Sequence, residues 1–202
     1  MSERYCFASM TRIADLDERP FHVEALDRSG WATGQYVAVE VDAPASGHRI
    51  ELTSGRLTEI AEDDLVVGAL GHRYATLEIT GTWEAVEEDG RMALLTGAGL
   101  LGKCTSRSSV VTPPTPVVYR GHVIRDGEPV CMDDFVEEVP DRDFDAPVVL
   151  IIGTSMSAGK TTAARIAIRI LKREGMKVLG SKVTGAGRYR DVLTMRDAGA
   201  DA

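Results

Sequence analysis

Two patterns of apolar and polar positions meet near residue 140 of the chain. Upstream, short runs alternate apolar and polar residues and are separated by turn-forming residues, which is typical of half-buried strands. Strands are predicted in five such runs: Gln35–Asp42, His48–Thr53, Leu65–Leu70, Arg73–Thr80 and Arg91–Leu95. Many short strands with turns between them predict a mainly antiparallel β domain, a barrel or a sandwich, over residues 1–135.

Two shorter segments of this β domain carry predictions of their own. The pair Asp89-Gly90 suits a hairpin turn, because both central residues of the favoured turn need positive φ. The segment Leu94–Ser109 is rich in glycine and hydroxyl residues, and a second anion-binding turn is one interpretation of it. No catalytic signature accompanies either segment.

Residues 136–147 form an acidic segment that we interpret as a solvated linker between two domains. The alternative is an acidic lip over a nucleotide site, although such a lip would repel phosphate. The composition changes on either side of this segment, so the domain boundary is expected here.

After the linker the pattern becomes that of an α/β protein. Val148–Ile152 is a continuous aliphatic run, typical of a strand buried on both faces. A helix is predicted from about Lys160 to Glu174, with Gly175 placed to end it, and Met176–Val183 is predicted to be a second strand. The apolar face of the helix is expected to comprise Ala163, Ile166, Ala167, Ile170 and Leu171. Residues 148–202 therefore predict a parallel βαβ unit.

The segment GTSMSAGKTT, Gly153–Thr162, follows the first of these strands and runs into the start of the helix. Its two glycines let the backbone turn tightly and present N–H groups to an anion, and the helix directs its positive end to the same place. Lys160 can reach the β- and γ-phosphates, and the Thr161 hydroxyl can bind Mg²⁺. We predict a phosphate-binding loop for a nucleoside triphosphate, with Lys160 as a catalytic residue. Its binding residues would be Gly153, Ser157, Ala158, Gly159, Lys160, Thr161 and Thr162.

Five residues separate the two glycines of this loop, whereas four separate them in the commonest phosphate loop. The longer spacing resembles that of dethiobiotin synthetase and its P-loop relatives, whose loop reads Gly-Thr-Asp-Thr-x-x-Gly-Lys-Thr. Ser155 and Met156 replace the acidic and hydroxyl residues of that loop. We therefore expect a member of the wider P-loop NTPase superfamily with a different substrate.

The resemblance also implies helper residues further along the chain. Lys182, followed by Thr184 and Gly185, matches the family's lysine and small-residue turn, which contact phosphate and substrate, so Lys182 is a second candidate catalytic residue. Asp191 matches an aspartate at a helix start that is positioned for Mg²⁺, with Asp197 the less favoured choice. Thr161 and Asp191 are thus the candidate metal ligands.

The function expected from these residues is binding of ATP with Mg²⁺. The leading hypothesis is an ATP-dependent ligase or kinase-type enzyme acting on a small acid, with Arg188 and Arg190 available to hold an anionic cosubstrate. An accessory or regulatory NTPase similar to the molybdopterin-guanine-dinucleotide accessory proteins is an alternative. A non-catalytic nucleotide-binding fragment is another.

The net charge and the distribution of charged residues limit which kinds of partner and location we expect. A formal net charge of −8 argues against a general nucleic-acid binder. The charged first twenty residues do not resemble a secretory signal, and no apolar run is long enough to span a bilayer, so a cytoplasmic protein without a membrane partner is expected. The cysteines and histidines lack metal-ligand spacing.

Residues 148–202 offer only two strands, one helix and the start of another, too few to cover a parallel sheet. We therefore expect an incomplete domain, in a chain that is a fragment or whose P-loop unit is covered by the β domain or by a second subunit. A homo-oligomer is the expected assembly.

Overall fold

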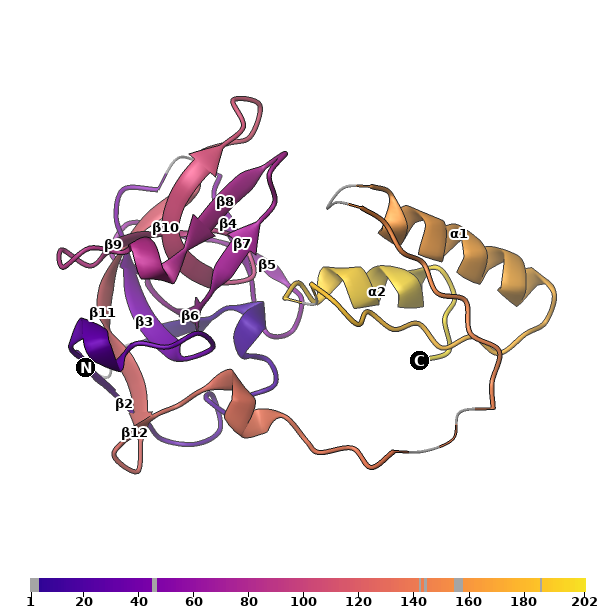
Figure 1. Cartoon of the computed structure of the whole chain (residues 1–202), viewed down its shortest axis with the longest axis horizontal. Coiled ribbons are helices and arrows are strands. Elements are labelled where there is room, and N and C mark those ends of the chain that lie inside the picture. Colours follow the sequence, from indigo (N-terminus) through magenta and orange to yellow (C-terminus); the bar gives the residue numbers. More distant parts are fainter. Residues whose placement is uncertain (1–3, 45–46, 142, 144, 155–157, 186) are drawn as a thin grey trace. The chain divides into compact units, whose positions relative to one another are not determined.

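The computed structural model of the chain describes residues 4–44, 47–141, 143, 145–154, 158–185 and 187–202 (Figure 1). The chain divides into two units. The first comprises Met1–Phe135 together with Gly187–Tyr189, and the second comprises Val136–Ala186 together with Arg190–Ala202. The first unit is built mostly of strands, and the helices longer than one turn belong to the second.

The first unit consists of short strands joined by turns and single helical turns. In chain order its strands are β1 (Tyr5–Phe7), β2 (His22–Glu24), β3 (Tyr36–Val41), β4 (Arg49–Glu51), β5 (Leu57–Glu59), β6 (Leu65–Leu70), β7 (His72–Tyr74), β8 (Ile79–Thr82), β9 (Arg91–Leu94), β10 (Leu100–Arg107), β11 (Thr115–Arg125) and β12 (Glu128–Pro129). Its 3-10 turns are Ser9–Thr11, Arg28–Gly30, Trp83–Ala85 and Met132–Phe135.

The main sheet of the first unit closes on itself. Its strand order is β1-β6-β3-β11-β9-β10-β8-β7, and β10 also pairs with β6, so β6, β3, β11, β9 and β10 form a ring. Within the described residues the pairs β1–β6 and β6–β10 are parallel and the other ladders are antiparallel. The predicted β-rich N-terminal region is confirmed, and its closed ring makes it a barrel.

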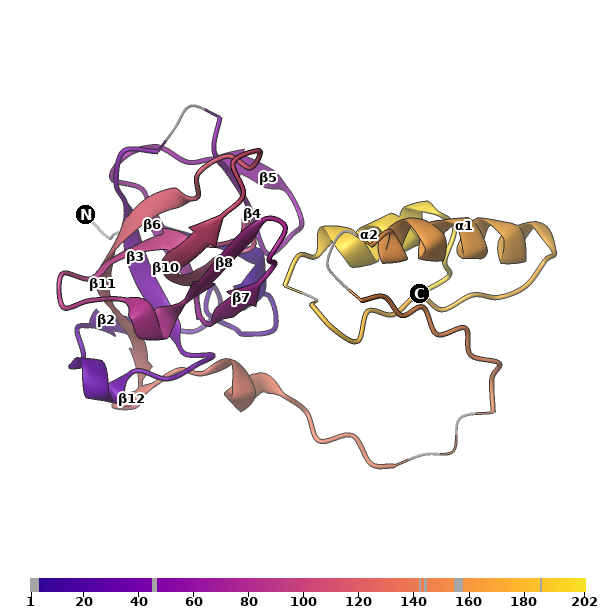
Figure 2. The ribbon, with the colours of Figure 1, turned by 45° about the horizontal axis from the view of Figure 1, so that its top comes forward.

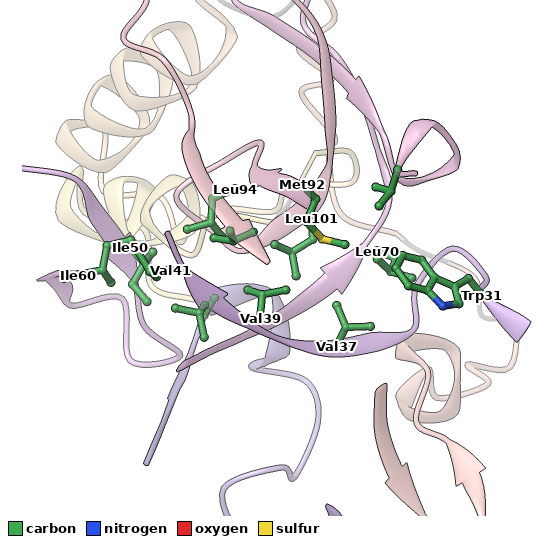
Figure 3. Close-up of a cluster of buried hydrophobic side chains, with 14 residues drawn as sticks. Trp31, Val37, Val39, Val41, Ile50, Ile60, Leu70, Met92, Leu94 and Leu101 are labelled. Carbon is green, nitrogen blue, oxygen red and sulfur yellow. The ribbon is translucent and has the colours of Figure 1, made fainter. Parts of the chain in front are cut away.

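Alternation along the strands produces two apolar clusters, one on each face of the sheet. On β3, Val37, Val39 and Val41 enter one cluster (Figure 3), whereas Tyr36 and Ala38 enter the other. The same division of successive residues recurs on β6. Each fully buried aliphatic side chain contributes about 1.5–3 kcal/mol to the stability of the fold. The pleat therefore explains why both sets of β3 residues are buried.

Most of the predicted strands of this unit are present, but two predictions are wrong. The run Arg73–Thr80 is interrupted by a turn that separates β7 from β8, and a hydrogen bond from Glu78 N–H to Ala75 O closes that turn at 2.8 Å. The turn near Asp89 lies one residue earlier than predicted, since Gly90 N–H donates to Glu87 O at 3.1 Å. In that turn Gly90, with φ of 65°, follows the central pair.

The second unit contains two helices that lie side by side in both views (Figures 1 and 2). They are α1 (Lys160–Arg173) and α2 (Arg190–Asp197). Their contact buries Ile168 of α1 and Met195 of α2, with Ala198 and Ala200 beside them. The predicted apolar face of α1 is thus only partly right, because Ile166 and Ile170 remain more than half exposed.

The end of α1 follows the local sequence signal closely. Gly175, with φ of 76°, donates its N–H to Lys172 O at 3.1 Å, and Met176 N–H donates to Leu171 O at 3.1 Å. These paired bonds form a Schellman cap, which satisfies carbonyl groups that the helix itself leaves open. The predicted helix and its terminating glycine are confirmed.

The two strands predicted for the second unit are not present as strands among the described residues. Residues 148–152 and 176–183 run without a ladder, and Val148, Val149, Leu150 and Ile152 are 67–81% exposed. A strand buried on both faces needs neighbours on both edges and layers on both faces. The predicted βαβ unit is therefore not confirmed, because these segments lack such neighbours in the described part of the unit.

One backbone pairing in the second unit nevertheless has the direction of a parallel pair. Asp201 N–H donates to Val178 O at 2.8 Å, and Gly180 N–H donates to Ala202 O at 2.7 Å. Residue numbers increase together along both segments. After α2 the chain thus returns to run beside residues 178–180, which lie between the two helices in the sequence.

Neither helix of the second unit, nor any helical turn elsewhere in the described residues, has the length and apolar character needed to cross a membrane.

Candidate functional site

The predicted phosphate loop leads into the N-terminus of α1. Gly159 is the residue that precedes the helix, with φ of 80°, and Ala163 N–H donates to Gly159 O at 2.9 Å to begin the helical ladder. A left-handed conformation at this position favours glycine, because other residues adopt it only with strain between the Cβ and their own backbone. Glycine also has no side chain that could cap the first turn. The first N–H groups of an α-helix lie outside its own i→i−4 ladder and point along the helix axis.

Lys160 extends back over the start of the loop. A Cβ added at Gly153 would lie 3.1 Å from Cγ and 3.2 Å from Cδ of Lys160, so the aliphatic stem of the lysine crosses directly above this glycine. A larger residue at 153 would push the stem aside. The absence of a side chain at Gly153, at the start of the loop, therefore leaves room for the stem of Lys160 near its end.

The charges of α1 favour an anion at its N-terminus. The first turn holds no acidic residue, while Lys172 and Arg173 lie in the last turn. The positive end of the helix dipole is thus not neutralised from within the helix, and the basic residues stabilise its negative end. Together with the ammonium group of Lys160, this end of α1 presents positive charge.

The second pair of predicted site residues is in direct contact. Lys182 Nζ forms an ion pair with Asp191 Oδ2, and the side chains are 22% and 21% exposed. Asp191 lies in the first turn of α2, where Thr194 Oγ1 donates to its carbonyl oxygen at 2.8 Å. Residues that the resemblance named separately are therefore partners in the structure.

The helices of this unit are tied together by a carboxylate that the sequence did not single out. Asp201 accepts two bonds from Lys172 Nζ and one from Val178 N–H, each 2.8 Å long. The bond from Lys172, followed by that from the Val178 backbone, lowers the pKa of Asp201 below its ordinary value. Asp201 thus joins the last turn of α1 to the segment that leads to Lys182.

The remaining predicted residues fall in different places. Ser157 lies outside the described residues, whereas Ala158 directly precedes Gly159, and Thr161 and Thr162 occupy the first turn of α1. Arg190 begins α2. Arg188 belongs to the first unit, where its guanidinium group would lie 2.8 Å from a Cβ built on Gly97, and not to the unit that carries the phosphate loop.

The residues predicted to bind Mg²⁺ have suitable chemistry, since a hydroxyl and a carboxylate provide the oxygen ligands that Mg²⁺ prefers. Groups of three or more His, Cys, Asp or Glu side chains arranged for a metal do not occur in the described part of the chain. A Mg²⁺ ion here would therefore be shared with phosphate oxygens, and not held by a cage of protein ligands.

The segment Leu94–Ser109, for which a second anion-binding turn is one interpretation, belongs to the first unit. Leu94 ends β9, and Leu100–Arg107 forms β10, whose Lys103 forms an ion pair with Glu87. Three of the glycine and hydroxyl residues that suggested a binding turn, Gly102, Thr105 and Ser106, thus belong to a barrel strand.

Comparison with protein families agrees with the local geometry of the loop. The family model described as "Domain of unknown function (DUF1611_C) P-loop domain" matches residues 136–187, about a quarter of the chain. No curated protein and no solved structure matches the chain. The family match supports a P-loop domain of the NTPase-like superfamily in this region, and such a domain indicates nucleotide binding.

Proposed function

We propose that the second unit binds the phosphates of ATP together with Mg²⁺, and that the protein uses ATP as a ligase or kinase-type enzyme acting on a small acid. The observation that supports this proposal most is the passage of the Lys160 stem over Gly153 at the glycine-led N-terminus of α1. This geometry collects an ammonium group and several backbone N–H donors at one place, which suits a polyphosphate.

Each residue of the site has a definite part in this proposal. The N–H groups of the first turn of α1 would hold phosphate oxygens, and Lys160 would neutralise charge on the β- and γ-phosphates. Lys182 would bring a second cation to the transferred phosphoryl group. Thr161 and Asp191 would hold Mg²⁺, which would further neutralise phosphate charge.

The chemistry then needs little covalent help from the protein. Phosphoryl transfer depends on holding the donor and the acceptor oxygen in line while cations surround the equatorial oxygens. An acid substrate fits such a site because its carboxylate oxygen would attack the γ-phosphorus, the bond from that phosphorus to the bridging oxygen would break, and the products would be an acyl phosphate and ADP. Arg190, at the start of α2, is the residue we assign to that carboxylate.

The test is a calorimetric titration of the full chain with ATP and Mg²⁺. We expect Lys160→Ala to weaken ATP binding by about 100-fold, corresponding to about 2.7 kcal/mol, because it removes a charge-assisted contact to phosphate. The matched control is Lys177→Ala, which removes an exposed lysine of the same unit and should leave the affinity unchanged.

Two results would contradict the proposal. Equal affinities of Lys160→Ala and the unsubstituted chain would remove the phosphate-loop assignment. Preferential binding of another nucleoside triphosphate would keep the loop but replace ATP as the ligand. Release of ADP that depends on an added small carboxylic acid is the result expected for a ligase or kinase-type enzyme, whereas ADP release that needs a protein partner would favour an accessory NTPase.

A further inference from the structure

The ion pair between Lys182 and Asp191 bears on how the proposed site takes up an anion. Its two side chains are about four-fifths buried, so the pair is less screened by water than the exposed ion pairs of the chain. An ammonium group already paired with a carboxylate presents little net charge to an approaching phosphate. The carboxylate itself repels that phosphate.

The position of Asp191 allows its side chain to move without moving its helix. Met195 of α2 packs against Ile168 of α1, and Ala198 and Ala200 extend the same contact. Asp201 fixes the chain that follows α2 through its bonds to Lys172 and Val178. These contacts do not involve the Asp191 carboxylate, so α2 stays in place if that side chain changes its rotamer and releases Lys182.

We infer that Asp191 is an internal competitor for Lys182: its carboxylate occupies the ammonium group in the ligand-free chain, and a bound polyphosphate takes its place. This inference rests on the proposed function, because the competing anion is the polyphosphate of a nucleotide. Affinity for phosphate is then reduced by the fraction of molecules in which the ion pair is closed. The contact therefore sets a threshold that selects highly charged anions over singly charged ones.

The inference is tested with Asp191→Asn and inorganic tripolyphosphate as the probe, measured by calorimetry in a chelator so that no metal binds Asp191. Asparagine keeps the size of the side chain and removes its charge. We expect tripolyphosphate to bind the variant about 10-fold more tightly than the unsubstituted chain, corresponding to about 1.4 kcal/mol. The matched control is Asp197→Asn, which makes the same charge change at an exposed position of α2 and should alter affinity less than 2-fold, a bound set by screening at the surface.

A second variant separates competition from a general effect of charge. In a Lys182→Met background the further change Asp191→Asn should give no gain, because the contested cation is absent. An equal gain in both backgrounds, or unchanged or weaker binding by Asp191→Asn alone, would overturn the inference.

Lys160→Ala distinguishes this failure from failure of the proposed function. If Lys160→Ala loses tripolyphosphate binding and Asp191→Asn shows no gain, the phosphate loop stands and only the competition is wrong. If Lys160→Ala binds as tightly as the unsubstituted chain, or if no variant binds tripolyphosphate, both the proposed function and the inference fail.

Discussion

The two units bury their apolar residues in different ways. In the first unit, strands that are distant in sequence close a ring, so that side chains on both faces of β3 are buried. Among the described residues of the second unit, the buried apolar side chains lie at the contact between α1 and α2, and the aliphatic run Val148–Ile152 remains largely exposed. A run of apolar residues thus leads to a packed core only where partners are present to cover it.

The largest expected effect distinguishes these two kinds of apolar residue. Leu101 of β10 is fully buried in the barrel, so Leu101→Ala should lower the free energy of unfolding by about 2–5 kcal/mol. Leu179 of the second unit is 70% exposed, so Leu179→Ala should change it by about 0.5 kcal/mol or less. Chemical denaturation measures both changes, and comparable losses would show that Leu179 is covered in solution.

Acid should destabilise the first unit through one buried side chain. His122 of β11 is fully buried. Its Nδ1 is hydrogen-bonded to the Tyr119 hydroxyl at 2.5 Å, and its Nε2 is hydrogen-bonded to Gln35 Oε1 at 3.1 Å. Burial lowers the pKa of His122 from 6.5 to about 4. The unfolded chain therefore binds a proton more readily than the folded unit between these values.

The direction in which stability changes with pH follows from this difference in pKa. The contribution of neutral His122 to stability is complete above about pH 6.5 and falls by about 3 kcal/mol as the pH decreases towards 4. His122→Gln should flatten this part of the curve of unfolding free energy against pH, while His22→Gln, at an exposed position, should leave it unchanged. A slope that persists in His122→Gln would assign the effect to other groups.

The corresponding acid effect in the second unit lies at lower pH. The pKa of Asp201 is lowered by its bonds to Lys172 and Val178, so its stabilising contribution is present above the ordinary aspartate pKa and is lost as the pH falls through the lowered value. Helix content followed by circular dichroism in acid should therefore respond to Asp201→Asn after the His122 transition is complete.

The sequence predicted the features that depend on neighbouring residues. β6 has the predicted bounds, and α1 ends at the glycine expected to end it, because alternation and capping are local signals. The turn of the phosphate loop into the helix is equally local, and Gly159 has the conformation that its place requires.

The features that the sequence did not predict depend on distant partners. β10 and β11 are the longest strands of the described residues, yet Gly102 and Lys103 interrupt any simple alternation along β10, and its ladder is formed with β6, β8 and β9. The bonds of Asp201 to Lys172 join residues that no spacing rule connects. For Lys182 and Asp191, resemblance named both residues but not their contact with each other.

The central claim, that phosphate binds in the second unit and not in the barrel, is tested most directly by nuclear magnetic resonance. Adding ATP and Mg²⁺ to the ¹⁵N-labelled chain should shift the amide signals of Gly159 to Thr162 first, with those of Lys182 and Asp191, while the signals of β3 and β6 stay in place. Shifts confined to the barrel strands, or no shifts at a millimolar concentration of ATP, would contradict the account.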